Sequence, residues 1–266
     1  PEAADTVKAH FLLAEISFDL ERYDDARNNY EIVAYQYPFY EDAAEAGYAA
    51  LLAYAKYNPT PERELEWRQL NVASAKRFVT EFPDDPRRGT VLVNTAETLL
   101  KDKYYEQALS TARLSQETGV ELPPRYRYGA SLVQGHSSFE LGFYDEAETS
   151  LLSASTYEKL SRKEKADLRQ KAAAAIYKQG EQVKTESPQQ AVDHWLRLAE
   201  VVPESTLKVN AEYDAATLLM EMQDYERAEG VLLKFREEYP DHELTKDIPS
   251  KLIVAYEGKG EWRKAA

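Results

Sequence analysis

The order of apolar and polar positions along the chain predicts helices. The segment LERYDDARNNYEIVAYQYP, residues 20–38, sets an alanine among charged residues, a tyrosine four residues behind it and a proline at its end. The segment MQDYERAEGVLLKFREEYP, residues 222–240, shares the Tyr three residues before the alanine and the final Tyr-Pro, and has a leucine four residues behind the alanine, again with helical spacing. Val and Ile are scattered, and only 10 glycines occur. The pattern therefore predicts an all-α fold that is built from a repeated unit.

An alanine at one fixed position marks the repeated unit. In five of six copies an aromatic residue stands three positions earlier, and the exception is Pro188, which suits the first turn of a helix. The alanines are Ala26, Ala108, Ala147, Ala191, Ala228 and Ala265, and the aromatic residues are Tyr23, Tyr105, Tyr144, Tyr225 and Trp262. Antiparallel helices approach closely only where one of them presents almost no side chain, so we interpret the alanine as the contact point of a helix pair.

One further unit lies in the interval of 82 residues between Ala26 and Ala108. We expect its helices at residues 41–57 and 64–86, joined by an enlarged loop, with Asn71 at the alanine position. In several units a proline stops the second helix, namely Pro38, Pro83, Pro203 and Pro240. The predicted units cover residues 5–40, 41–86, 89–122, 126–160, 170–205, 209–242 and, in part, 246–266.

The pattern resembles the tetratricopeptide repeat (TPR) family. The residues that fit its 34-residue consensus are Ala14, Tyr23, Ala26, Tyr30, Val33 and Pro38 in the first unit, and Ala216, Tyr225, Ala228, Leu232 and Phe235 in the unit that ends at Pro240. The second and fifth units depart from it. The resemblance implies an α-α superhelix, a TPR solenoid of antiparallel helix pairs, in one domain of about six full repeats and a truncated seventh. The alternative is an ordinary helical bundle whose Ala and Tyr merely fit a helix period.

Charge and composition reduce the number of functions that the chain could have. The formal net charge of −14 disfavours binding to duplex nucleic acid, because phosphates are bound by a face of Lys and Arg. The sequence contains no run of eighteen apolar residues, the length needed to span a bilayer. It also contains no cysteine, which excludes disulfides and thiolate metal ligands. Because the chain opens on Pro1 and stops within a unit, we expect a fragment of a longer protein whose localisation signal is missing.

The sequence contains no motif for catalysis, cofactor binding or metal binding. The four histidines, His10, His136, His194 and His242, never stand three or four residues apart, and the glycines form no phosphate-binding loop and no nucleophile elbow. The acidic segments DDARNN and PDDP lack the central Gly and closing Glu of a calcium loop. We therefore expect no metal, no cofactor and no enzymatic activity.

The resemblance places the binding surface on the first helix of each unit, which lines the concave side of a TPR superhelix. By register the predicted partner-binding residues are Phe11, Glu15, Phe18, Asp19, Tyr48, Leu52, Asn94, Glu97, His136, Phe139, Glu140, Tyr177, Glu181, Tyr213, Asp214 and Thr217. The clamp of Lys, Asn and Arg with which some TPR proteins hold a C-terminal carboxylate is not found at the matching positions. We expect a protein or peptide partner that is basic or has apolar anchors, and no nucleic acid. For the three tyrosines, packing between repeats is an equal alternative.

The links between units carry a second resemblance. YPFYEDAAEA, FPDDPRRGTV and YPDHELTKDI are similar to links in the TPR arrays of bacterial cell-envelope proteins, which implies a periplasmic or outer-membrane-associated setting, with the cytoplasm as the alternative. Two hypotheses follow. The chain is a non-enzymatic scaffold that binds a partner on its concave face, or it is an accessory segment of a larger membrane-associated export, polysaccharide-secretion or assembly machine whose functional module lies outside it. Self-association through the repeat ends is also open.

Overall fold

The computed structural model describes residues 2–37 and 39–265, and all regular elements in these ranges are helices. The all-α fold class that the sequence predicts is confirmed. The chain divides into two compact units, Pro1–Val133 and Gln134–Ala266, and the division falls within helix α7 (Pro124–Leu141). Pro1 and Pro38, which the sequence analysis singled out, lie outside the described residues.

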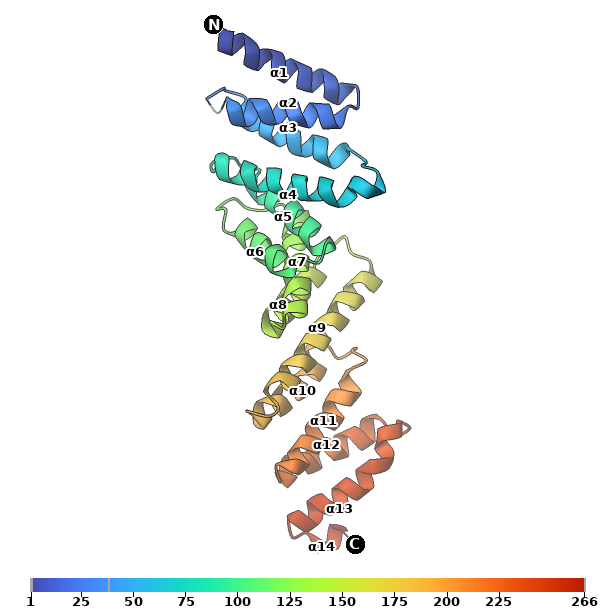
Figure 1. Cartoon of the computed structure of the whole chain (residues 1–266). Coiled ribbons are helices and arrows are strands. Elements are labelled where there is room, and N and C mark those ends of the chain that lie inside the picture. Colours follow the sequence, from blue (N-terminus) through green and yellow to red (C-terminus); the bar gives the residue numbers. More distant parts are fainter. Residues whose placement is uncertain (1, 38, 266) are drawn as a thin grey trace. The chain divides into compact units, whose positions relative to one another are not determined.

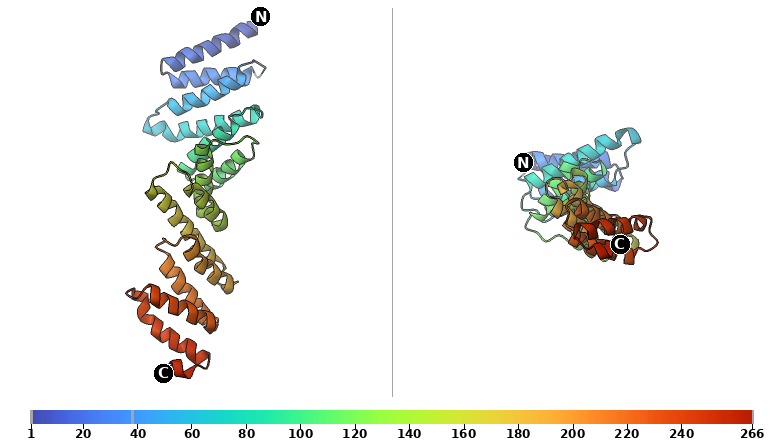
Figure 2. Two further views of the ribbon diagram at one scale, coloured as in Figure 1. Left: turned by 180° about the vertical axis from the view of Figure 1, so that it is seen from behind. Right: turned by 90° about the horizontal axis from the view of Figure 1, so that it is seen from below.

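The first unit is a series of helices in which each packs against the next one along the chain. Neighbouring helices run in opposite directions and lie side by side in both Figure 1 and Figure 2. A short 3-10 helix, Pro61–Arg63, interrupts the loop before α4. The helices ahead of α7 are α1 (Glu2–Asp19), α2 (Tyr23–Gln36), α3 (Ala43–Lys56), α4 (Glu64–Glu81), α5 (Arg88–Lys101) and α6 (Tyr105–Gln116).

The second unit repeats the same arrangement after α7, again with each helix packed against its successor. A 3-10 helix, Glu243–Asp247, precedes α13. The helices are α8 (Tyr144–Ser155), α9 (Arg162–Val183), α10 (Pro188–Val201), α11 (Lys208–Glu221), α12 (Tyr225–Glu238), α13 (Ile248–Gly258) and α14 (Trp262–Ala265). Three second helices end two residues before a proline, since the residue ahead of proline disfavours helical geometry: α4 before Pro83, α10 before Pro203 and α12 before Pro240.

The repeated alanine is the point of closest approach between paired helices. Ala26, Ala108, Ala147, Ala191 and Ala228 have no exposed surface. Each lies in the first turn of a second helix, where a longer side chain would push the first helix of its pair away. The residue type at this position is therefore fixed by packing.

The turn inside five helix pairs has one repeated geometry. Two residues before the aromatic residue that starts the second helix, the backbone adopts the left-handed conformation, with φ between 58° and 82° at Glu21, Lys103, Gly142, Gln223 and Gly260. The amide of the left-handed residue and the next amide donate hydrogen bonds to carbonyls three and five residues earlier. This bonding closes the C-terminus of the first helix and reverses the chain.

We predict opposite effects of alanine at two open glycines. A Cβ would meet no atom within 4 Å at either Gly142 or Gly230, but only Gly142 has a positive φ, of 82°. Gly142→Ala should lower the free energy of unfolding by about 1 kcal/mol because the left-handed conformation strains a side chain. Gly230→Ala, inside α12, should raise it by about 0.5–1 kcal/mol. Urea titrations of the two variants measure both effects, and equal signs would contradict the role of the turn.

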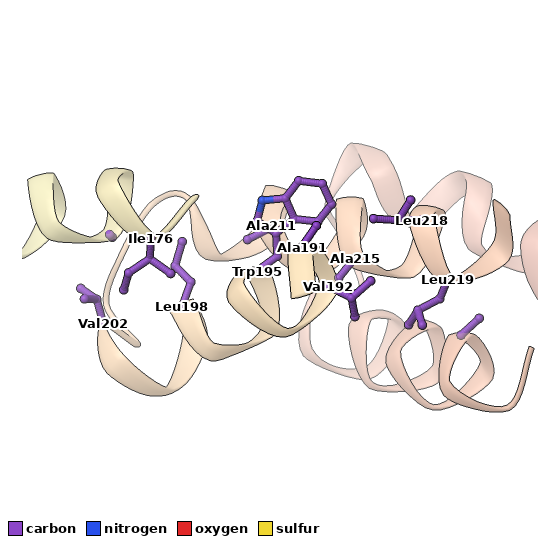
Figure 3. Packing of buried hydrophobic residues seen from close by; sticks show 12 residues of the cluster. Ile176, Ala191, Val192, Trp195, Leu198, Val202, Ala211, Ala215, Leu218 and Leu219 are labelled. Carbon is purple, nitrogen blue, oxygen red and sulfur yellow. The ribbon is translucent and has the colours of Figure 1, made fainter. Parts of the chain in front are cut away.

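The largest core of the second unit forms around Trp195 (Figure 3). Its indole is 2% exposed and packs among side chains of α9, α10 and α11, and its Nε1 donates a hydrogen bond to the carbonyl oxygen of Tyr177 at 3.1 Å. Gly180 on α9 makes room for the ring, because a Cβ there would collide with the indole. The polar edge of the tryptophan is thus satisfied while its apolar surface joins three helices.

Candidate partner-binding site

A pocket in the first unit lies among α3, α4 and α5 and is called the α3–α5 pocket below. Its volume is about 520 Å³, within the range of sites that take small ligands or short peptide segments. Two first helices, α3 and α5, supply most of its walls, and one side of α4 completes it. The lining residues are Tyr48, Leu51, Leu52, Ala55, Asn71, Val72, Ala75, Val91, Asn94, Thr95, Glu97, Thr98 and Lys101.

The pocket coincides with a departure from the repeat pattern. Asn71 stands where the other units carry the close-contact alanine, and it is half-buried and lines the pocket. At the turn end of the same pair, the ring of Trp67 lies 4.9 Å from that of Tyr54 and 4.3 Å from that of Tyr57, and Trp67 donates a hydrogen bond to the carbonyl of Tyr54. In this pair the α4 residue at the alanine position is therefore a half-buried asparagine that lines the pocket, and not a fully buried alanine.

The acidic residues near the pocket are neutralised by arginines of other helices. Glu97 accepts two hydrogen bonds from Arg125 of α7, at 2.8 and 3.2 Å, and hydrogen bonding to Glu97 raises the pKa of the guanidinium. Asp102 pairs with Arg68 of α4 at 2.8 Å. Lys101 is exposed, lines the pocket and has no ion pair with any residue in the described part of the chain. Of the two charged side chains that line the pocket, Glu97 is therefore paired and Lys101 is not.

Four of the sixteen predicted partner-binding residues meet in this pocket: Tyr48, Leu52, Asn94 and Glu97. They are the predicted residues of α3 and α5. The sequence analysis missed Val72, Thr98 and Lys101 as lining residues, and also Asn71, although an amide at the usual alanine position was a readable signal for the last. Arg125 was missed because no register argument shows which side chain of the next repeat reaches Glu97.

The predicted residues of α1 lie away from the pocket. Phe11 and Phe18 pack against the ring of Tyr30, with centroids 6.0 and 6.4 Å away, so they join α1 to α2. Glu15 and Asp19 are exposed. Burial, and then the charges of these two acids, raise the pKa of Tyr30 to about 12. A role in partner binding for these four residues stays a prediction.

The predicted residues of α7 gather around one lysine in the second unit. Lys171 of α9 donates a hydrogen bond to Nδ1 of His136 at 2.8 Å and lies 3.7 Å from the carboxylate of Glu140 and 5.0 Å from the ring centre of Phe139. Burial and the lysine charge lower the pKa of His136 to about 4. The imidazole is therefore neutral at pH 7, and the cluster joins α7 to α9.

The remaining predicted residues also contact neighbouring helices. The hydroxyl of Tyr177 donates a hydrogen bond to Asp214, which joins α9 to α11; burial and this bond raise the pKa of the tyrosine. The hydroxyl of Tyr213 lies 3.4 Å from the Asp247 carboxylate. In addition, Glu181 pairs with Lys178, and the Thr217 hydroxyl is buried with no hydrogen-bond partner among the described residues. Contacts between successive first helices therefore involve Tyr177, Tyr213 and Asp214.

Two further features bear on function. Among the described residues no group of three or more His, Cys, Asp or Glu side chains could hold a metal ion. Within the same ranges, no helix has the length and apolar character needed to cross a membrane.

The repeated helix pairs define the chain as a helical-repeat protein of the α-α type. The family model described as "Tetratricopeptide repeat" matches residues 210–242, the segment that holds α11 and α12. The match supports the TPR family and, with it, a protein-interaction scaffold. No curated protein matches the chain.

The solved structures that match the chain include the following two. The crystal structure of BtubC from P. vanneervenii is 19% identical and covers 78% of this chain and 87% of its own, with a TM-score of 0.32. The TPR2AB domain of yeast Sti1, in its pHSP90 complex, is 12% identical and covers 96% of this chain and 99% of its own, with a TM-score of 0.31.

Proposed function

We propose that the chain is a non-enzymatic interaction scaffold and that the α3–α5 pocket binds a peptide segment of a protein partner. The observation that carries the proposal is the pocket itself, which two first helices line both with core residues and with the exposed side chains of Leu52, Asn94 and Lys101. Leu52 is 43% exposed although it lines a concave wall. An apolar side chain of a partner would remove this surface from water.

The polar wall of the pocket suits a peptide backbone. The side-chain amides of Asn71 and Asn94 form no hydrogen bond with another described residue, and each offers both donors and an acceptor. A peptide backbone presents the complementary groups at regular intervals. An apolar wall with free amides opposite is therefore a site for a short segment of chain, bound through its side chains and its backbone.

The proposal predicts that filling the pocket abolishes peptide binding. A 12-residue random peptide library displayed on phage is selected on the chain, and the enriched peptides are synthesised with a fluorescent label. Leu52→Trp should weaken their binding about tenfold or more because the indole occupies the pocket. Leu114→Trp is the matched control, since Leu114 is also 43% exposed but lies on α6 outside the pocket.

Fluorescence polarisation gives the affinities, and circular dichroism melts show whether both variants keep the fold. Equal affinity of the two tryptophan variants for every selected peptide would place binding elsewhere and would contradict the proposal. Failure of the wild-type chain to enrich any peptide would likewise contradict a peptide site.

We also propose a bacterial envelope setting, either for the scaffold alone or within a larger membrane-associated machine. The support for it is the similarity of the inter-repeat links to those of envelope TPR arrays. Fractionation of the source cells with an antibody against the chain tests the setting, and recovery in the cytoplasm alone would contradict it.

A further inference from the structure

From the charges around the α3–α5 pocket we infer that its partner peptide is acidic: it carries an aliphatic side chain for the Leu52 wall and a carboxylate for Lys101. This inference rests on the proposed function, because it specifies the ligand of the same pocket. It differs from the basic partner that the sequence suggested. That expectation rested on acids of the first helices, and in the structure Glu97 of this pocket is paired with Arg125.

The charge argument depends on which groups near Lys101 are already paired. The acid one turn before it on α5, Glu97, is held by Arg125 through two hydrogen bonds. The acid that follows it, Asp102, pairs with Arg68, which also pairs with Glu64 at the start of α4, outside the pocket lining. Neither carboxylate has to turn to Lys101 to be neutralised. The ammonium group of Lys101 is thus the charge in the pocket wall that remains for a ligand to match.

The position of Lys101 along the pocket gives the spacing between the site for the carboxylate and the amide of Asn94. The helices α3 and α5 run parallel, because each is antiparallel to α4: Tyr54, late in α3, and Asp102, at the end of α5, both contact the start of α4. Lys101 therefore lies at the same end as Ala55. Asn94 stands seven residues before Lys101, roughly 10 Å away along the helix.

A peptide that spans this distance needs about three extended residues. Its aliphatic side chain would contact Leu52, Ala55 and Val72, its backbone would meet the amides of Asn71 and Asn94, and its carboxylate would reach Lys101. The net charge of −14 on the chain opposes an acidic peptide at long range, but salt screens charges beyond about 8 Å at physiological ionic strength. The contact with Lys101 is shorter than that and decides the preference.

The test is a charge swap between the pocket and the peptide. Random 12-residue peptides are selected on the wild-type chain and, separately, on Lys101→Glu. An enriched wild-type peptide is synthesised with its acid as Glu, Gln or Lys, and its affinity is measured by fluorescence polarisation. The change from Glu to Gln should weaken binding to the wild-type chain about threefold to tenfold, and binding to Lys101→Glu by less than about twofold. Selection on Lys101→Glu should enrich Lys or Arg at the same position.

Lys103→Glu is the matched control, because it makes the same change of charge two residues away on the turn, outside the pocket lining. It should leave the preference for the acid unchanged. Equal effects of the two lysine variants, or enriched peptides without an acid, would overturn the inference. If peptides bind and Leu52→Trp blocks them but no acid is needed, only the inference fails. If Leu52→Trp blocks no peptide, the proposed function fails as well.

Discussion

Trp195→Ala should lower the free energy of unfolding of the second unit by about 3–5 kcal/mol. The indole is 2% exposed and contacts three helices, so its removal leaves a cavity that the helices cannot close together (Figure 3). The carbonyl of Tyr177 also loses its hydrogen-bond donor. In an array where each repeat contacts only its neighbours, the loss of stability is confined to α9, α10 and α11. These helices should then unfold at a lower urea concentration than the first unit.

Urea titration followed by circular dichroism measures the overall loss, and hydrogen exchange of the backbone amides locates it. Trp262→Ala is the matched control, since this tryptophan is 65% exposed, and its removal should cost less than about 0.5 kcal/mol. A loss below 1 kcal/mol in Trp195→Ala, or faster exchange in α2 to α5 as well as in α9 to α11, would show that the repeats do not unfold by neighbour contacts.

The parts of the fold that the sequence could predict are those that repeat. Ala26 and Ala228 stand in the same place of two units because the same close contact forms in both, and the structure buries both completely. The conformation of the turn that precedes them was harder to predict from the sequence. Its left-handed residue is glycine at Gly142 and Gly260, but a charged or polar residue at Glu21, and a residue with a side chain gives no sign of a positive φ.

The pocket was the part that the repeat pattern could not predict. It lies where the repeat of residues 41–86 departs from the pattern at Asn71, and the effect of such a departure depends on the packing of the neighbouring helices. Ion pairs between the side chains of first helices could not be predicted from the repeat pattern either. The register put Glu97 on a helix face that lines the pocket, but it could not show that Arg125, 28 residues later, pairs with its carboxylate.

A buried ion pair in the second unit should govern the response of its stability to pH. Glu148 of α8 is 8% exposed and accepts hydrogen bonds from Arg197 of α10 at 2.7 Å on each carboxylate oxygen, and from Gln179 of α9 at 2.8 Å. Burial acts to raise the pKa of this carboxyl, but the bonds from Arg197 and Gln179 outweigh it, and the pKa lies below the ordinary value of 4.5. The pair therefore stabilises the fold above about pH 4.5, and this stability is lost as the pH falls through the lower pKa of the folded state.

Arg197→Met should cost about 2–3 kcal/mol at pH 7, less than the loss of a fully buried partner because more than a third of the arginine is exposed. Without the guanidinium, burial dominates and the pKa of Glu148 rises above its ordinary value, so the folded state takes up a proton before the unfolded state does. The deficit against the wild type should then shrink between pH 7 and pH 4 in urea titrations. Adding Glu148→Gln to Arg197→Met removes the unpaired charge and should restore much of the stability at pH 7. A deficit independent of pH, or no rescue by the glutamine, would show that Arg197 acts by packing alone.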